Sequence, residues 1–132
     1  MARVAQDRLT PARAARSVLI VDDHESFHRA VRVLLEGAGF DVVGASEDAA
    51  GALAAAARLR PAIVLLDIGL PDGDGFEVAE QLAGRDDPPV VIMVSSREIA
   101  GYRRRLAASP ARGFIAKGDL SADALEALLG GA

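Results

Sequence analysis

The sequence contains no cysteine among its 132 residues. This absence excludes disulfides, thiolate nucleophiles and zinc sites built on sulfur, and it is consistent with a reducing compartment. Four arginines lie near the N-terminus without an apolar segment behind them, and no run in the chain approaches the ~20 apolar residues of a membrane-spanning helix. We therefore expect a cytoplasmic protein that does not associate with a membrane.

Positive charge is not in excess. The chain has 15 lysines and arginines against 19 aspartates and glutamates, which gives a formal net charge of -4. Such a balance provides no overall attraction to a polyphosphate backbone, so we expect no direct binding to nucleic acid. Hydrophobic residues make up 51% and charged residues 26%, as in an ordinary globular protein. A chain of this length buries one core, which predicts a single domain.

Short apolar runs alternate with helix-periodic stretches five times along the chain. This alternation is typical of strand-helix units that form a parallel sheet. The expected strands are 18–21, 41–45, 62–66, 90–94 and 113–116. The expected helices are 26–36, a stretch capped by Ser46 that ends before Pro61, a stretch around 76–82, residues 97–108, and a last helix capped by Ser121. Residues 1–16 show no strand pattern and are predicted to form a disordered leader.

A polar residue follows the apolar run at four of the predicted strands. These residues are Asp22 with Asp23, Asp67, Ser95 and Lys117. In doubly wound sheets, ligands bind beyond the carboxyl ends of the strands, where the strand order reverses. With the order 2-1-3-4-5 this point lies between the first and third strands, which end at the three aspartates. We interpret the group as a phosphoryl-accepting carboxylate site.

Three neighbouring carboxylates repel one another, so the predicted site requires a compensating cation. Oxygen ligands without cysteine or a histidine cluster favour a hard cation, and a shallow site that also holds phosphate oxygens suits Mg²⁺. Lys117 supplies a second positive charge. His24 and His28 lack an accompanying zinc motif and are expected on the surface.

Four segments together resemble the receiver domain of two-component response regulators over about residues 17–130. The segments are VLIVDDHESF, IVLLDIGLPDGDGF, VVIMVSS and GFIAK. The DDH opening and the GFIAK ending followed by glycine look most like receivers attached to LuxR-type or NarL-type helix-turn-helix modules. The resemblance implies a flavodoxin-like (βα)5 doubly wound parallel sheet with strand order 2-1-3-4-5. It also implies a role in phosphorelay signal transduction, with a histidine kinase or a histidine phosphotransfer protein as the phosphoryl donor.

The resemblance further implies a role for each acidic residue. Asp67 would accept the phosphoryl group, and the domain would act as a stoichiometric phosphoacceptor that can react with small donors and dephosphorylate itself, rather than as an enzyme. Asp22, Asp23 and Asp67 would hold Mg²⁺ together with the backbone carbonyl of Gly69.

The remaining site residues would form the switch. By resemblance, Ser95 donates its hydroxyl to the phosphoryl group, Lys117 pairs with that group, and Phe114 is the aromatic residue that changes rotamer. The surface of the fourth helix, fifth strand and fifth helix would then contact a downstream protein or a second copy of the chain. The sequence leaves open whether a DNA-binding module belongs with this domain.

Three alternatives remain open from the sequence. The chain could be a receiver-like interaction module whose output ignores phosphorylation. It could be a flavodoxin-like or phosphatase-type enzyme acting on a small phosphorylated substrate, although neither a flavin-phosphate loop nor a second general acid lies near Asp67. Asp72 and Asp74 also suggest a calcium loop, but the bidentate glutamate of such a loop is missing at the required distance.

Overall fold

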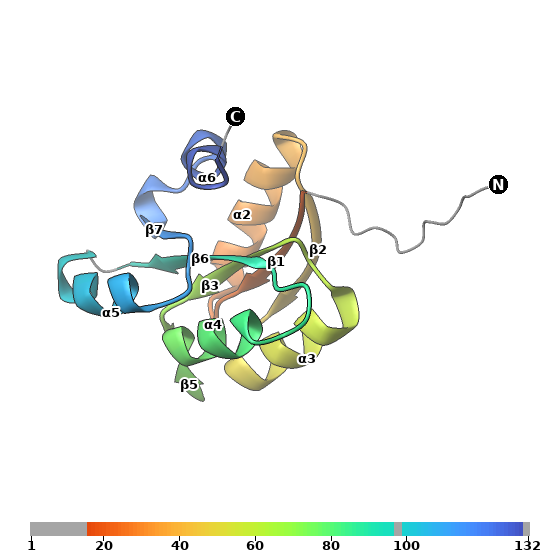
Figure 1. Ribbon diagram of the computed structural model, residues 1–132. Coiled ribbons are helices and arrows are strands. Elements are labelled where there is room, and N and C mark those ends of the chain that lie inside the picture. Colours follow the sequence, from red (N-terminus) through yellow and green to blue (C-terminus); the bar gives the residue numbers. More distant parts are fainter. Residues whose placement is uncertain (1–15, 97–98, 131–132) are drawn as a thin grey trace.

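The computed structural model describes residues 16–96 and 99–130. Five parallel strands form one sheet in the order β2-β1-β3-β6-β7 (Figure 1). The strands are β1 (Ser17–Val21), β2 (Asp41–Ser46), β3 (Ile63–Asp67), β6 (Val90–Ser95) and β7 (Gly113–Ala116). Counting only the strands of this sheet, the order is 2-1-3-4-5, so the predicted flavodoxin-like fold is confirmed.

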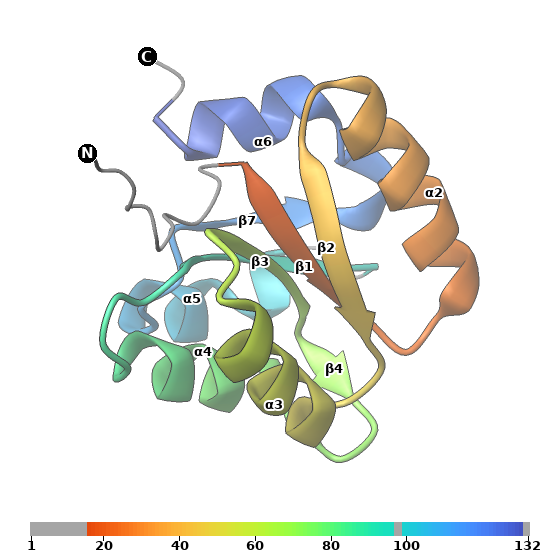
Figure 2. The ribbon, with the colours of Figure 1, turned by 90° about the vertical axis from the view of Figure 1, so that its right-hand side faces the viewer.

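Helices cover both faces of the sheet, as Figures 1 and 2 show. One face packs against α2 (Glu25–Gly37) and α6 (Ala122–Leu128), and the other packs against α3 (Ala49–Leu59), α4 (Gly75–Ala83) and α5 (Arg103–Ala108). Alternate side chains of β1 point into the two cores: Leu19 faces the α3 and α4 side, and Ile20 faces the α2 side. Burial on both faces explains why the central strands are continuous apolar runs.

None of the helices in the described residues is both long and apolar enough to cross a bilayer. Residues 1–15 of the expected leader lie outside the described residues. Arg16, the last residue of that segment, pairs with Glu126 of α6 at 3.0 Å and donates to the carbonyl of Ala38 at 3.1 Å. Its guanidinium also lies 3.8 Å from the centre of the Phe40 ring. Arg16 therefore joins the start of β1 to α6 and to the connection between α2 and β2.

The start of α3 differs from the prediction. Ser46 was expected to cap this helix, but it is the last residue of β2 and pairs with Val21 of β1. Asp48 is the N-cap instead, and its carboxylate accepts a hydrogen bond from the Gly51 amide at 2.7 Å. The expectation was wrong because pairing with β1 extends the strand by one residue and delays the helix.

The helix expected over residues 97–108 is also different. Residues 97 and 98 lie outside the described residues. A short 3-10 helix, η1 (Ile99–Gly101), precedes α5, and Tyr102 between them has a non-helical backbone. Gly101 has a low helix propensity, which accounts for the interruption. The last helix, α6, begins as expected after Ser121, whose hydroxyl accepts from the Ala124 amide at 3.0 Å.

A small hairpin that the apolar pattern did not predict follows β3. It pairs β4 (Gly69–Leu70) with β5 (Gly73–Asp74). The Asp72 carboxylate at its tip accepts from the amides of Ala49 and Ala50 at 2.6 and 3.1 Å, and these bonds lower the pKa of Asp72. Asp74 caps α4 and pairs with Arg105 of α5. The two carboxylates of the calcium alternative therefore hold helix ends.

Candidate functional site

The carboxyl edge of the sheet brings the predicted site residues together. Asp22 follows β1, Asp67 ends β3, Ser95 ends β6, and Lys117 follows β7. The strands lie side by side in that order, and the registers pair Asp67 with Val94 and Ser95 with Ala116. Parallel pairing thus converts four separate strand ends into one site.

The acidic part of the site contains four close side chains. Asp22, Asp23, His24 and Asp67 each have a ligand atom within 4.8 Å of the others. Asp22 has no exposed surface and Asp67 is 6% exposed, whereas Asp23 and His24 face solvent. At this separation and an effective dielectric constant of 20, the repulsion between Asp22 and Asp67 is on the order of 3 kcal/mol before compensation by neighbouring charges. The arrangement is therefore suited to attract a cation.

Lys117 provides positive charge from within the protein. Its ammonium pairs with Asp22 Oδ2 and lies 3.5 Å from Asp67 Oδ2. The ring of Phe27, whose centre is 4.7 Å from Nζ, covers the ammonium from the α2 side. The lysine side chain is only 15% exposed, so solvent screens these interactions weakly. Lys117 therefore links the carboxylates that end β1 and β3.

The two buried carboxylates differ in their pKa values. Burial alone raises the pKa of Asp22, but hydrogen bonds from Lys117 and from the amide and ring of His24 outweigh burial and hold this pKa below its ordinary value. Burial also raises the pKa of Asp67, and there the Lys117 charge does not compensate for burial and the Asp22 charge, so the pKa stays above its ordinary value. Asp22 is thus the stabilised anion, and Asp67 is the more basic carboxylate.

Replacement of Asp67 by asparagine is expected to stabilise the fold. Because the folded-state pKa of Asp67 is raised, its contribution to stability is greatest below the ordinary value of 3.8 and is lost as pH rises through the folded pKa. Asp67→Asn should raise the free energy of unfolding near pH 7 by about 1 kcal/mol and the melting temperature by about 4 °C. Thermal melts of both proteins over a pH series measure this, and the gain should shrink on acidification. A destabilised variant would contradict the raised pKa.

The other residues named from the sequence lie around this group. The Gly69 amide donates to Asp67 Oδ1 at 3.3 Å. Ser95 is buried, and Phe114 in β7 is half-buried and lies opposite Met93 of β6. Phe114 also lines a groove of about 630 Å³ between β7, α6 and the η1–α5 segment. Strands β6 and β7 thus connect the carboxyl edge, where Ser95 lies, to the open groove that Phe114 lines.

His24 was expected on the surface, which is confirmed, but its contacts with the carboxylates were not predicted. Its side chain is exposed, but Nδ1 lies 2.9 Å from Asp22 Oδ1 and 3.0 Å from Asp23 Oδ1. The signal available in the sequence was its position directly after the two aspartates. His28 is not a member of the acidic group. Its Nε2 contacts the backbone carbonyl oxygen of Asp22 at 2.5 Å.

The donor set fits a divalent cation. Three carboxylates supply the oxygen atoms that Mg²⁺ prefers, and two of them are held in place by hydrogen bonds from the backbone. A cavity of about 350 Å³ opens beside them. The residues that line this cavity are His24, Ser26, Phe27, Ser96 and Lys117.

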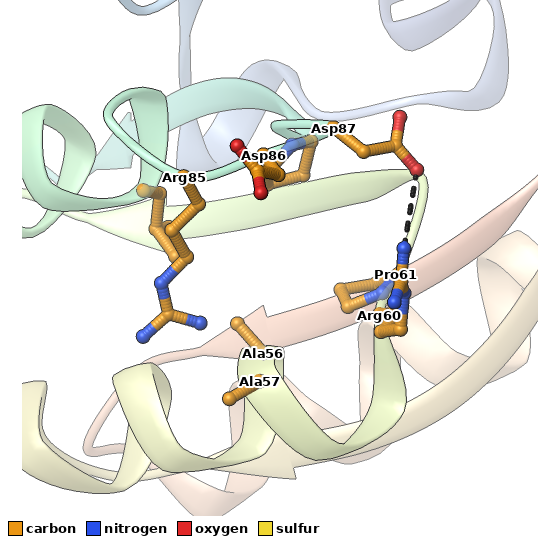
Figure 3. A pocket seen from close by; sticks show the side chains of 9 residues that line it. Ala56, Ala57, Arg60, Pro61, Arg85, Asp86 and Asp87 are labelled. Carbon is orange, nitrogen blue, oxygen red and sulfur yellow. Dashed lines mark ion pairs between the residues drawn. The ribbon is translucent and has the colours of Figure 1, made fainter.

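A second cavity, of about 320 Å³, lies where α3 and α4 end, and it shares no lining residue with the acidic group. Figure 3 shows its charged side chains, including the Arg60–Asp87 ion pair at 3.5 Å. Arg85 donates to the backbone carbonyl of Leu53 at 3.1 Å. The two arginines of this cavity, Arg60 and Arg85, thus pair with groups of the same chain. We therefore assign the candidate function to the carboxyl edge of the sheet.

The chain is similar to curated transcription regulators. The chain is 39% identical over 100 residues to the virulence factors putative positive transcription regulator BvgA of Bordetella pertussis, covering 76% of this chain and 48% of BvgA. It therefore spans about half the length of that curated relative.

Solved receiver domains have the same fold. The receiver of a modulated diguanylate cyclase from Desulfovibrio desulfuricans G20 is 32% identical, with a TM-score of 0.75 over 88% of this chain and 91% of that one. The receiver of the putative response regulator NarL from Mycobacterium tuberculosis is 28% identical, with a TM-score of 0.74 over 86% and 96%. The family model described as the response regulator receiver domain matches residues 18–129. The chain therefore belongs to the receiver domain family of response regulators.

Proposed function

We propose that this domain, residues 17–130, accepts a phosphoryl group on Asp67 from a phosphohistidine and changes a protein-interaction surface in response. The observation that carries the proposal is the pairing of one buried, relatively basic carboxylate with a half-buried lysine. Asp67 ends β3 beside two further aspartates, and its Oδ2 lies 3.5 Å from Lys117 Nζ. Membership of the receiver family makes a histidine kinase or a histidine phosphotransfer protein the expected donor.

The transfer is a displacement at phosphorus. A carboxylate oxygen of Asp67 forms the new P–O bond in line with the breaking P–N bond, and the electron pair of that bond returns to the imidazole nitrogen of the donor. Lys117 and the hydroxyl of Ser95 bind the phosphoryl oxygens. The product is an acyl phosphate, which water later cleaves, so the domain acts once per phosphoryl group.

Mg²⁺ would be held by Asp22, Asp23, Asp67 and the backbone carbonyl of Gly69, and when bound it supplies positive charge that neutralises the phosphoryl oxygens. Asp22 is suited to this task because its lowered pKa keeps it ionised. Lys117 holds Asp22 and Asp67 in place from the buried side. Asp22 thus stays ionised to hold the cation, and Asp67 is the carboxylate that reacts.

Phosphorylation would alter the surface through β6 and β7. The new group adds about -1.5 to -2 charges and three strong acceptors, which draw the Ser95 hydroxyl towards Asp67. Ser95 pairs in register with Ala116, two residues beyond Phe114. Phe114 is half-buried at the open groove beside α6, so it has space into which it can turn. A change from 1% to 99% of the active form requires roughly 5.5 kcal/mol, which a few charge-assisted hydrogen bonds can supply.

The experiment that tests this function measures phosphoryl incorporation and the surface change in the same sample. The chain is incubated with Mg²⁺ and acetyl phosphate, and we expect one phosphoryl adduct by intact mass. Hydroxylamine should remove this adduct, because hydroxylamine cleaves acyl phosphates. Amide exchange should change over residues 113–128, and chelation of Mg²⁺ by EDTA should prevent both results. No adduct in the presence of bound Mg²⁺ would contradict the proposal and favour the phosphorylation-independent module.

A further inference from the structure

The imidazole of His24 lies against two carboxylates at the same time. Its Nδ1 is 2.9 Å from Asp22 Oδ1 and 3.0 Å from Asp23 Oδ1. Asp22 Oδ1 also accepts a hydrogen bond of 2.8 Å from the His24 amide, which orients the turn after β1. One nitrogen and two carboxylate oxygens from three consecutive residues thus lie close together.

The distances from the His24 nitrogen to the two oxygens match the spacing of neighbouring ligands around a metal. Ligands at right angles around an octahedral cation, with bonds of about 2.1 Å, are about 3.0 Å apart. The distances from Nδ1 to the two oxygens have this length. Asp67 supplies a further ligand atom within 4.8 Å of the group. The geometry therefore allows the nitrogen to bind the cation that the carboxylates bind.

The positions of Lys117 and His24 support the same conclusion. Lys117 pairs with Asp22 and Asp67 on the buried side of the site, whereas Asp23 pairs with His24 on the exposed side. The His24 side chain is 65% exposed and lines the cavity of about 350 Å³ beside the carboxylates. Lys117 lines the same cavity, but its side chain is only 15% exposed, so the imidazole is the more accessible of the two groups to a cation from solvent.

We propose that His24 is an additional ligand of the divalent cation in this site, and that it makes the site prefer Mn²⁺ to Mg²⁺. The inference rests on the proposed function for the location of the cation. Carboxylates and carbonyls suit Mg²⁺ and Mn²⁺ alike, but an imidazole nitrogen favours first-row transition metals. One nitrogen among oxygen donors therefore shifts the preference of the site.

The chain offers a matched pair of variants for the test. His24 is the N-cap residue of α2, but its side chain forms no capping hydrogen bond, so His24→Ala should leave the helix intact. His28→Ala removes the other histidine, whose Nε2 contacts a backbone carbonyl and not a carboxylate. The readouts are Mn²⁺ and Mg²⁺ affinities by calorimetry, and nitrogen coupling to bound Mn²⁺ by pulsed electron paramagnetic resonance.

We expect nitrogen coupling in the wild type and in His28→Ala, and its loss in His24→Ala. The affinity of His24→Ala for Mn²⁺ should fall about tenfold, with a much smaller change for Mg²⁺. Bound Mn²⁺ without nitrogen coupling would overturn the inference, as would coupling that persists in His24→Ala. Tighter metal binding by His24→Ala would also overturn it, because His24 would then compete with the cation.

The inference and the proposed function fail in different ways. If wild-type protein forms the acyl phosphate with Mg²⁺ but shows no nitrogen coupling with Mn²⁺, the role of His24 is wrong and the phosphoryl-acceptor function stands. If neither metal binds, the inference is wrong and the metal-dependent mechanism is wrong as well.

Discussion

Asp67→Asn and Asp67→Ala are expected to abolish phosphoryl incorporation, with a loss of at least about a thousandfold in rate. An amide or a methyl group offers no anionic oxygen to attack phosphorus. Asp22 cannot replace it readily, because this carboxylate is fully buried and its two oxygens are engaged by Lys117 and His24. Intact mass after incubation with acetyl phosphate and Mg²⁺ measures the loss directly.

Asp72→Asn is the matched control for this experiment. Asp72 lies five residues along the same loop, but its carboxylate bonds to amides at the start of α3 and takes no part in the acidic group. We expect this variant to incorporate phosphate at close to the wild-type rate. Because Asp67→Asn should be more stable than the wild type, loss of its adduct cannot be attributed to unfolding. Strong labelling of another residue in Asp67→Asn would show that the acceptor is misassigned.

Gly75→Ala is expected to destabilise the domain by about 3 kcal/mol. A Cβ at Gly75 would lie 2.3 Å from the backbone oxygen of Asp67 and 2.9 Å from the Cα of Ile68. The Gly75 amide also donates to the Ile68 carbonyl at 2.8 Å, so the start of α4 is fastened to the end of β3. These atoms belong to the backbone, so α4 and the acceptor strand must separate to admit a methyl group.

The same variant should also impair the site, because the displaced backbone carries the acceptor carboxylate. Urea denaturation gives the loss of stability, and the rate of phosphoryl incorporation should fall more than tenfold in the fraction that stays folded. Gly37→Ala is the control. Gly37 is the last residue of α2, and a Cβ there meets nothing within 4 Å, so we expect a change of no more than about 1 kcal/mol, in the stabilising direction. Equal stability of the two variants would contradict the close approach at Gly75.

The sequence by itself determined the sheet and the main residues of its carboxyl edge. Central strand segments such as 18–21 and 63–66 are buried on both faces, so every position in them is apolar and the runs stand out from the helical periodicity. Asp22 directly follows β1 and Asp67 is the last residue of β3, so the polar residues mark the ends of these strands. Since parallel strands place their carboxyl ends along one edge, Asp22, Asp67 and Lys117 could be assigned to one site without coordinates.

Only the tertiary structure decided the local boundaries. Ser46 and Asp48 are both good capping residues, and the choice between them depended on how far β2 pairs with β1. The 4-residue hairpin ladder of β4 and β5 is too short for a periodic signal, and it is held by Asp72 bonding to α3, more than twenty residues away. Contacts between distant segments outweigh local propensity at such positions.

The tertiary structure also decided the electrostatics of the site. The sequence placed Lys117 at the edge, but its pairing with both Asp22 and Asp67 depends on the distance between β1, β3 and the end of β7. At these distances the hydrogen bonds of Asp22 outweigh burial and lower its pKa, whereas burial raises the pKa of Asp67. Residue types follow from the chain, whereas charge interactions depend on separation and on exclusion of water, and both of these exist only in the folded molecule.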